Sequence, residues 1–144
     1  MTTSALSRTD SRVDLGIALL RVLLGILFIA HGGQKIFSFG LGTVTSGFSQ
    51  MGIPMASITA PLVAIVELVG GIALVLGLFT KIAAILLAID MIGAILLVHL
   101  RNGFFLPNGY EFALTLLVAS VAMLLTGPGA YSLDHVLAAR RRAP

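Results

Sequence analysis

The most informative residue in this sequence is Glu67, a single carboxylate near the middle of the apolar stretch Pro61–Phe79. As a helix, that stretch would be roughly 28 Å long, close to the ~30 Å hydrocarbon thickness of a bilayer. A carboxylate facing lipid there opposes insertion by roughly 2.5–3.5 kcal/mol. Gly70 and Gly71 share nearly the same helical face and allow another helix to approach closely. We therefore predict that Glu67 faces protein or a wet cavity.

Two more charged residues, Arg21 and Asp90, interrupt apolar stretches. Counting along ideal helices from the cytoplasmic end of each predicted span places Arg21 roughly 9 Å deep, Asp90 about 12 Å and Glu67 about 18 Å. Three unpaired charges in lipid would oppose insertion by roughly 8–10 kcal/mol, so pairing or protonation is expected. Two interpretations stay open. One is a structural ion pair of Arg21 with Glu67 or Asp90, and the other is a carboxylate that relays protons or anchors a ligand.

A second group of polar residues is predicted near the outer face. His31 and His99 fall at nearly the same depth, about 24–26 Å from the cytoplasmic ends of their spans. His31 shares one helical face with Gln34 and Lys35, at spacings of three and four residues. Further polar groups at this level are Arg101, Asn102, Asn108, Tyr110 and Glu111. Together they could line a pocket with an apolar lower half and a polar mouth.

Such a pocket suits a quinone, whose ring carbonyls need hydrogen-bond donors and whose tail needs apolar surface. Histidine can also exchange protons near neutral pH. The candidate catalytic residues are Glu67, His31 and His99. The candidate ligand-binding residues are Arg21, Gln34, Lys35, Arg101, Asn102, Tyr110 and Glu111. Ordinary interfacial histidines are the alternative, and no metal is predicted, because His31, His99 and Glu111 have suitable ligand types without a metal-site spacing.

Helical geometry limits this pocket. Asp90 and His99 are nine residues apart, which places them about 180° apart around an ideal helix. At most one of them is therefore expected to reach the Glu67 pocket, unless the end of the helix is distorted. Arg101, eleven residues from Asp90, shares its face.

The elements that must position these residues are membrane helices. Hydrophobic residues make up 58% of the chain and charged residues only 10%, against about 25% in soluble domains. We predict an all-α, integral membrane four-helix bundle at 15–134, with spans at about 15–37, 58–79, 82–100 and 111–126. Residues 1–14 are predicted as a mobile cytoplasmic tail and 135–144 as a basic cytoplasmic tail. Short surface helices are expected in the first outer loop, around Thr43–Met51, and near the C-terminus.

Charge distribution predicts the orientation of the bundle. Six basic residues lie on the side of the two termini, namely Arg8, Arg12, Lys81 and Arg140–Arg142. The opposite side has only Lys35 and Arg101. The positive-inside rule therefore places both termini in the cytoplasm. A signal peptide is the competing interpretation of the N-terminus, but Arg21 within the apolar run disfavours it.

The absence of cysteine restricts the chemistry of this chain. It excludes dithiol relays, thiolate metal sites and cysteine-bound iron–sulfur clusters. No covalent cofactor is expected, so any redox role needs a bound cofactor, a quinone or a partner protein. The basic residues flank membrane helices, and no nucleic-acid partner is predicted.

With these residues in view, the sequence resembles the DoxX family of small four-helix membrane proteins. The similarity runs from about Leu15 to Asp134, through Arg21 with His31-Gly32 and Lys35, then VELVGGIALVLGLFTK, HLRNGFF, NGYEFAL and GPGAYSLD. The family is similar to the membrane subunit of thiosulfate:quinone oxidoreductase, and other members look like membrane components tied to redox or oxidative-stress responses. Asp90 lies outside the family pattern, which favours Glu67 as the shared functional carboxylate.

The resemblance implies a multi-pass protein of the bacterial cytoplasmic (inner) membrane. Its expected function is that of a redox-linked subunit, which binds a quinone or quinone-like molecule near the outer leaflet together with a redox partner protein, and which could form a homo-oligomer. Whether it is itself catalytic, as a subunit of a quinone-linked oxidoreductase, stays open. A non-catalytic scaffold or assembly protein is one alternative, and a small proton-coupled transporter is another.

Overall fold

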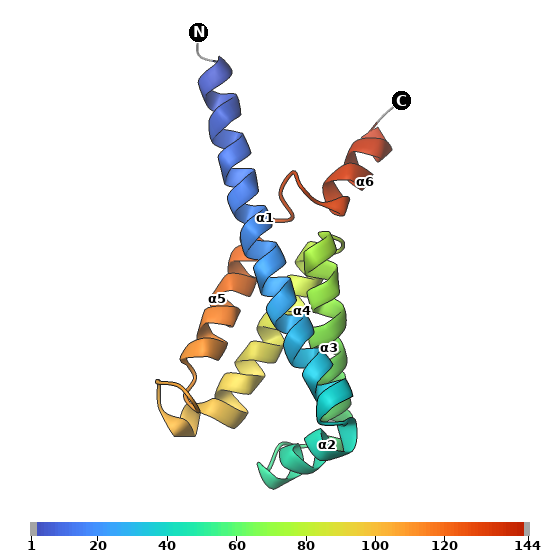
Figure 1. Cartoon of the computed structure of the whole chain (residues 1–144), viewed down its shortest axis with the longest axis vertical. Coiled ribbons are helices and arrows are strands. Elements are labelled where there is room, and N and C mark those ends of the chain that lie inside the picture. The colour runs from blue at the N-terminus through green and yellow to red at the C-terminus, as the bar shows by residue number, and fades with distance from the viewer. Residues whose placement is uncertain (1–2, 143–144) are drawn as a thin grey trace.

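The computed structural model describes residues 3–142, and every regular element in that part of the chain is a helix (Figure 1). Four long helices make up the body, with the bounds α1 Thr3–Gly33, α3 Ala56–Leu76, α4 Thr80–Ala94 and α5 Glu111–Thr126. Two short helices are α2 Leu41–Gln50 and α6 Leu133–Arg142. They confirm the two short helices predicted from the sequence. Helix α1 begins at Thr3, so the described part of the predicted N-terminal tail is helical.

Three helical stretches are long and apolar enough to cross a membrane: Ser11–Ser38, Ala56–Leu76 and Thr80–Asn102. Helix α5 is also apolar but has only 16 residues. Both ends of the described chain lie at the same end of the bundle, and α2 lies at the opposite end (Figure 1). The end that carries both chain ends is called the terminal end below, and the other the α2 end.

Two of the long helices end in π-helical turns. Helix α1 continues into the π-helix η1 Gln34–Ser38, and α4 continues into η2 Ile95–His99 and then a 3₁₀ turn, η3 Leu100–Asn102. Both π turns lie at the α2 end of the bundle. A π turn takes one residue more per turn than an α turn, so it rotates the next residues of the chain around the helix axis.

Small residues let α1 and α3 approach closely. A Cβ atom on Gly32 would lie 2.5 Å from the backbone N of Leu68, and one on Gly71 would lie 2.7 Å from the carbonyl oxygen of Gly25. Lipid tails are as apolar as side chains, so close packing rather than the hydrophobic effect holds membrane helices together. Since Gly71 contacts α1 while Gly70 contacts Leu87 of α4, the face of Glu67 is the packed face that the sequence predicts.

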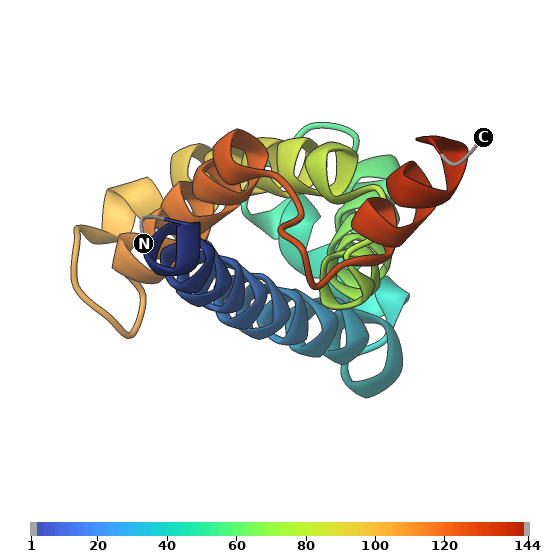
Figure 2. The ribbon, with the colours of Figure 1, turned by 90° about the horizontal axis from the view of Figure 1, so that it is seen from above.

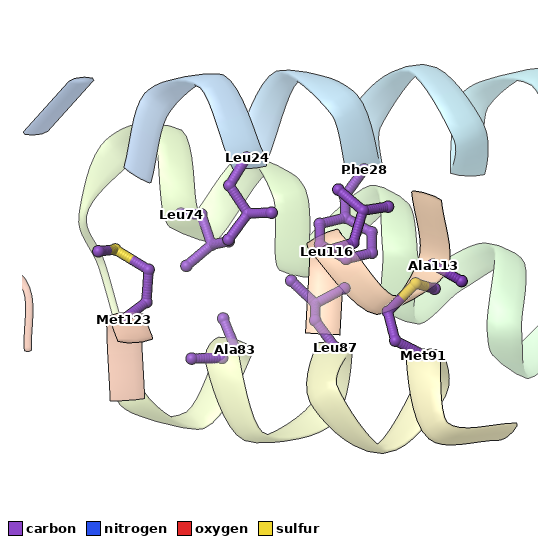
Figure 3. Packing of buried hydrophobic residues seen from close by; sticks show 10 residues of the cluster. Leu24, Phe28, Leu74, Ala83, Leu87, Met91, Ala113, Leu116 and Met123 are labelled. Atoms are coloured by element: carbon purple, nitrogen blue, oxygen red, sulfur yellow. The ribbon is translucent and has the colours of Figure 1, made fainter. Parts of the chain in front are cut away.

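The apolar core lies between all four long helices (Figure 3). Leu24 of α1 lies beside Leu74 of α3 there, and Phe28 of α1 lies beside Leu116 of α5. Other residues of α4 and α5 complete the cluster, including Leu87, Met91 and Met123. Helices α3 and α4 are closest near their connecting turn and diverge toward the α2 end (Figures 1 and 2).

Candidate functional site

A cavity of about 760 Å³ occupies the space between the diverging helices. Its walls come from α1, α3, α4 and α5, and toward the α2 end it is lined by Phe48, Met51 and Ile53 together with Leu106 and Pro107 of the α4–α5 loop. Most of the lining is apolar. The charged or ionisable side chains that line it are His31, Lys35, Glu67, Asp90 and His99.

Glu67 lies at the centre of this polar group. Its side chain is buried, with 3% of the residue's surface exposed, and its Oε2 forms an ion pair with Nζ of Lys35. Lys35 comes from the π turn η1, four residues beyond His31, so the end of α1 supplies both basic groups. The prediction that Glu67 faces protein and a cavity is confirmed, and its partner is Lys35.

Asp90 reaches the same cavity from α4. Its Oδ2 atom is buried and has no hydrogen-bond partner among the described residues. A buried carboxylate oxygen without a partner loses the hydrogen bonds that water would give it, at a cost of about 1–3 kcal/mol or more. This atom is therefore a vacant hydrogen-bonding position in the cavity wall.

His99 also lines the cavity, on the same helix as Asp90. The expectation that only one of the two residues reaches the Glu67 pocket applies to an undistorted helix, and the end of this helix is distorted. The π turn Ile95–His99 is the physical reason, because one extra residue in a turn rotates the next residues by roughly 100° relative to an ideal α-helix. Nδ1 of His99 lies 2.9 Å from the carbonyl oxygen of Asn108, which fixes the ring against the α4–α5 loop.

His31 lines the cavity from α1. Its ring lies against that of Phe112 on α5, with the centroids 5.6 Å apart and the planes inclined by 50°. Phe112 lines the cavity as well. The first long helix and the last are therefore joined at the level of the Lys35–Glu67 ion pair.

Arg21 lies elsewhere, among residues of the terminal end. Its Nη1 donates hydrogen bonds to the carbonyl oxygens of Leu74 (2.5 Å) and Val75 (3.0 Å), and its Nη2 donates to that of Tyr131 (2.6 Å). It forms no ion pair with Glu67 or Asp90, so the predicted pairing of these residues is replaced by Lys35–Glu67. Arg21 does not line the cavity.

Of the predicted ligand-binding residues, Lys35 lines the cavity, whereas Gln34, Arg101, Asn102, Tyr110 and Glu111 do not. Gln34 and Arg101 are exposed. Glu111 accepts a hydrogen bond at Oε1 from the backbone N of Leu106 (2.7 Å), and Asn102 Nδ2 donates to the carbonyl oxygen of Val98 (3.3 Å). Tyr110 packs edge-on against Phe104, with centroids 5.3 Å apart. Glu111 and Asn102 thus order the loop that lines the cavity rather than facing its interior.

The sequence predicts that part of the pocket is apolar, but it does not identify the apolar residues that line it. Ile53 and Phe48 line the cavity from the polar, glycine-rich segment between α1 and α3, where nothing in the sequence distinguishes them from ordinary loop residues. Metal-binding geometry is also not present in the described part of the chain, where no three His, Asp or Glu side chains are grouped to hold an ion. His31, His99 and Glu111 therefore do not form a ligand set there.

Comparison with known proteins identifies the family. The DoxX family model matches residues 16–100. The chain is 37% identical to the "Uncharacterized membrane protein Rv3486" of Mycobacterium tuberculosis, over 86% of this chain and 82% of the relative. It is 39% identical to the "Putative oxidoreductase CatD" of Bacillus subtilis, over 84% and 86%. It is 35% identical to the "Inner membrane protein YqjF" of Escherichia coli, over 86% and 93%.

No solved structure matches the chain. The family match covers more than half of the sequence, and the relatives align along most of their length. The family match, the inner-membrane relatives and the three apolar helices of membrane-spanning length place the protein in the bacterial inner membrane as a multi-pass protein. The chain is a member of the DoxX family of membrane proteins.

Proposed function

We propose that this DoxX-family protein is a redox-linked membrane subunit, which binds a quinone or quinone-like molecule in the cavity between its four long helices. The observation that carries the proposal is the convergence of five ionisable side chains from three helices on an otherwise apolar cavity. Its volume, about 760 Å³, lies within the roughly 300–1,000 Å³ of small-molecule sites. Small-molecule sites are usually lined by apolar side chains, and a small number of polar groups orient the ligand.

The polar groups can form hydrogen bonds with both the oxidised and the reduced form of a quinone. The Lys35 ammonium has three N–H donors, and Glu67 accepts from it in the only ion pair of the described residues, so donors remain for a ring carbonyl. The vacant Oδ2 of Asp90 can accept a hydrogen bond from a ring hydroxyl of the reduced form. The imidazole nitrogens of His31 and His99 add hydrogen-bonding groups to the cavity wall. The cavity thus offers partners to both redox states.

The chain itself offers no evident electron donor, because it contains no cysteine and the described residues hold no metal-ligand group. A redox partner protein or an external reductant would supply electrons. One relative is named a "Putative oxidoreductase", which supports a redox role over a transport role. A scaffold role in a redox complex is the competing proposal.

We further infer four membrane spans, with both termini in the cytoplasm. Both chain ends lie at one end of the bundle, so the number of crossings is even and α5 is the fourth span (Figure 1). Lys81 and the basic residues of α6 lie at that end, which the positive-inside rule assigns to the cytoplasm. The cavity then lies toward the outer leaflet. Because the chain has no cysteine, single cysteines at Ser46 and Arg140 can be labelled from outside and inside cells to test this orientation.

The test of the proposed function is binding by the purified protein in lipid nanodiscs. Solvent extraction with mass spectrometry should detect a co-purifying quinone, and added ubiquinone-1 should bind saturably. Glu67→Gln removes the charge that holds Lys35, and we expect affinity to fall by about tenfold or more, as for a lost charged hydrogen bond of ~1.5–3 kcal/mol. Gly93→Leu should also weaken binding, because Gly93 lines the cavity and a side chain there meets open space.

A matched control is Ser120→Ala. Ser120 is buried outside the cavity, and its hydroxyl donates to the carbonyl oxygen of Leu116 within its own helix (2.8 Å). Binding should be unchanged in this variant. No co-purifying quinone, together with no saturable binding, would remove the proposal. Cavity variants that retain cellular function while variants of the α4–α5 loop lose a partner protein would favour the scaffold role.

A further inference from the structure

Some residues of α3 and α4 both line the cavity and belong to the exposed apolar surface of the protein. Leu62 lines the cavity, yet 56% of its surface is exposed. Leu86 and Ile89 of α4 also line it and are 46% and 60% exposed. Leu62 belongs to an exposed apolar stripe of α3 that also contains Ile58, Ile65 and Val69. Leu86 and Ile89 belong to a similar stripe of α4 that also contains Ile82, Ile85 and Ile92.

The arrangement of the helices explains why the cavity is open at this place. Gly70 of α3 packs on Leu87 of α4, with a Cβ at Gly70 only 3.1 Å from Leu87 Cγ, and neither residue lines the cavity. Beyond this contact α3 and α4 diverge (Figures 1 and 2). The α1 side of α3 is sealed by the contact of Ala64 with Gly32. Leu62, two residues before Ala64, is about 200° away around the helix and lies on the other side.

We propose that the cavity opens sideways into the bilayer between α3 and α4, and that its ligand is an amphiphile with one apolar chain lying in this opening. The head group would bind among Lys35, Glu67 and Asp90. The identity of that head group rests on the proposed function, whereas the opening does not. The proposal adds where the ligand comes from and which part of it fits which wall.

The residues at the α3–α4 side of the cavity and at its α2 end favour a ligand with an apolar chain that comes from the lipid over a water-soluble ligand. Leu62, Leu86 and Ile89 offer only aliphatic surface, so an isoprenoid or acyl chain would exchange lipid contacts for equivalent protein contacts there. The α2 end, which faces water in the proposed topology, is lined by apolar residues such as Phe48 and Ile53. A charged solute entering that way would lose its hydration against apolar side chains.

The absence of tryptophan makes the opening directly testable. Leu116→Trp places one tryptophan at a position that lines the cavity and is only 4% exposed. In vesicles of phosphatidylcholine brominated on its acyl chains, we expect its fluorescence to be quenched, because an acyl chain can enter the opening. Ile72→Trp, on the exposed face of α3 and outside the cavity, is the lipid-facing reference. Met91→Trp, buried and lining the cavity, is a second reporter if Leu116→Trp fails to fold.

Closing the opening gives the decisive comparison. Leu62→Phe with Ile89→Phe, added to the Leu116→Trp reporter, should remove much of the quenching, whereas Ile65→Phe with Ile85→Phe should leave it unchanged. The second pair lies on the same exposed stripes but outside the cavity. Unquenched reporters, or equal quenching in both pairs, would overturn the lateral opening. Because brominated lipid contains no quinone, quenching without quinone binding would overturn the proposed function and leave the opening standing.

Discussion

The two ends of the bundle bury charge in opposite ways. At the terminal end, Arg21 donates three hydrogen bonds to main-chain carbonyls, and it does not line the cavity. At the α2 end, Lys35 and Glu67 pair beside a cavity of about 760 Å³, and Asp90 presents an oxygen without a partner among the described residues. We call these the Arg21 cluster and the Lys35–Glu67 cluster. A charge bonded to fixed backbone groups holds a fold together, whereas charges beside a space can bind a molecule that enters it.

The Arg21 cluster connects segments that are distant along the chain. It joins α1 to the last turn of α3 and to Tyr131 of the α5–α6 loop. In the same region the Asp134 carboxylate accepts hydrogen bonds from the backbone N of Phe79 and of Thr80, each 2.9 Å long, and so caps α4. Carboxylates stabilise helix N-termini because unpaired backbone N–H groups and the helix dipole are there. The chemistry of this end is therefore that of a joint between helices.

The largest expected effect comes from Arg21→Met, which keeps the length of the side chain and removes its donors. The carbonyl oxygen of Leu74 would lose a charged donor in a buried place, those of Val75 and Tyr131 would lose one in a partly buried place, and we expect about 3–5 kcal/mol of destabilisation. The destabilisation is measured by heating the protein in detergent and monitoring the remaining folded protein by size-exclusion chromatography. Arg21→Lys should recover part of the stability. Unchanged stability in Arg21→Met would mean that this cluster does not hold the helices together.

A smaller effect is expected from Gly77→Ala at the same end. Gly77 has φ +65°, and a Cβ there would lie 2.6 Å from Nη1 of Arg21 and 2.5 Å from Cβ of Ser132. The left-handed conformation disfavours alanine by roughly 1–2 kcal/mol, and the contacts add to this. Gly93→Ala is the matched control at the other end, since nothing lies within 4 Å of a Cβ there. Equal melting temperatures for the two variants would contradict the claim that the terminal end is held by tight contacts while the α2 end borders a cavity.

Asp134→Ala should have a smaller effect again, of about 1 kcal/mol, because it removes one helix cap. We expect a modest drop in melting temperature with quinone binding unchanged, since Asp134 is not part of the cavity lining. His135→Ala, at the exposed neighbouring position, is the control and should alter neither. A loss of binding in Asp134→Ala would show that the two ends are coupled.

The smallest effect on stability is expected from Asp90→Asn, at the Lys35–Glu67 cluster. Its Oδ2 has no partner to lose among the described residues, so stability should change by no more than about 0.5 kcal/mol. Affinity for ubiquinol-1 should nevertheless fall by about tenfold or more, because the amide replaces one of the two carboxyl oxygens with an NH₂ group, which cannot accept a hydrogen bond. Titration of the reduced and the oxidised quinone with the same preparation measures this. Stability loss without any change in affinity would assign Asp90 a structural role.

Much of the membrane architecture can be predicted from local sequence properties. The apolar runs predict helices of membrane-spanning length, because composition and length along one segment decide whether it can cross a bilayer. The placement of Glu67 against protein is also predictable, since a carboxylate avoids lipid and Gly70 and Gly71 mark the packed face. The shared level of Lys35 and His31 is predictable as well, because both belong to the same helical segment.

The partners of the buried charges were decided by tertiary structure. Arg21 meets Tyr131, 110 residues away, and depth along ideal helices carries no information about such a contact. The same counting separates His99 from Asp90, whereas the π turn at Ile95–His99 brings both to one cavity. A π turn depends on how the end of a helix packs and bonds, which apolar periodicity does not encode. The sequence by itself therefore determined which segments enter the membrane and that Glu67 avoids lipid, while long-range contacts decided that one buried charge joins helices and another borders a cavity.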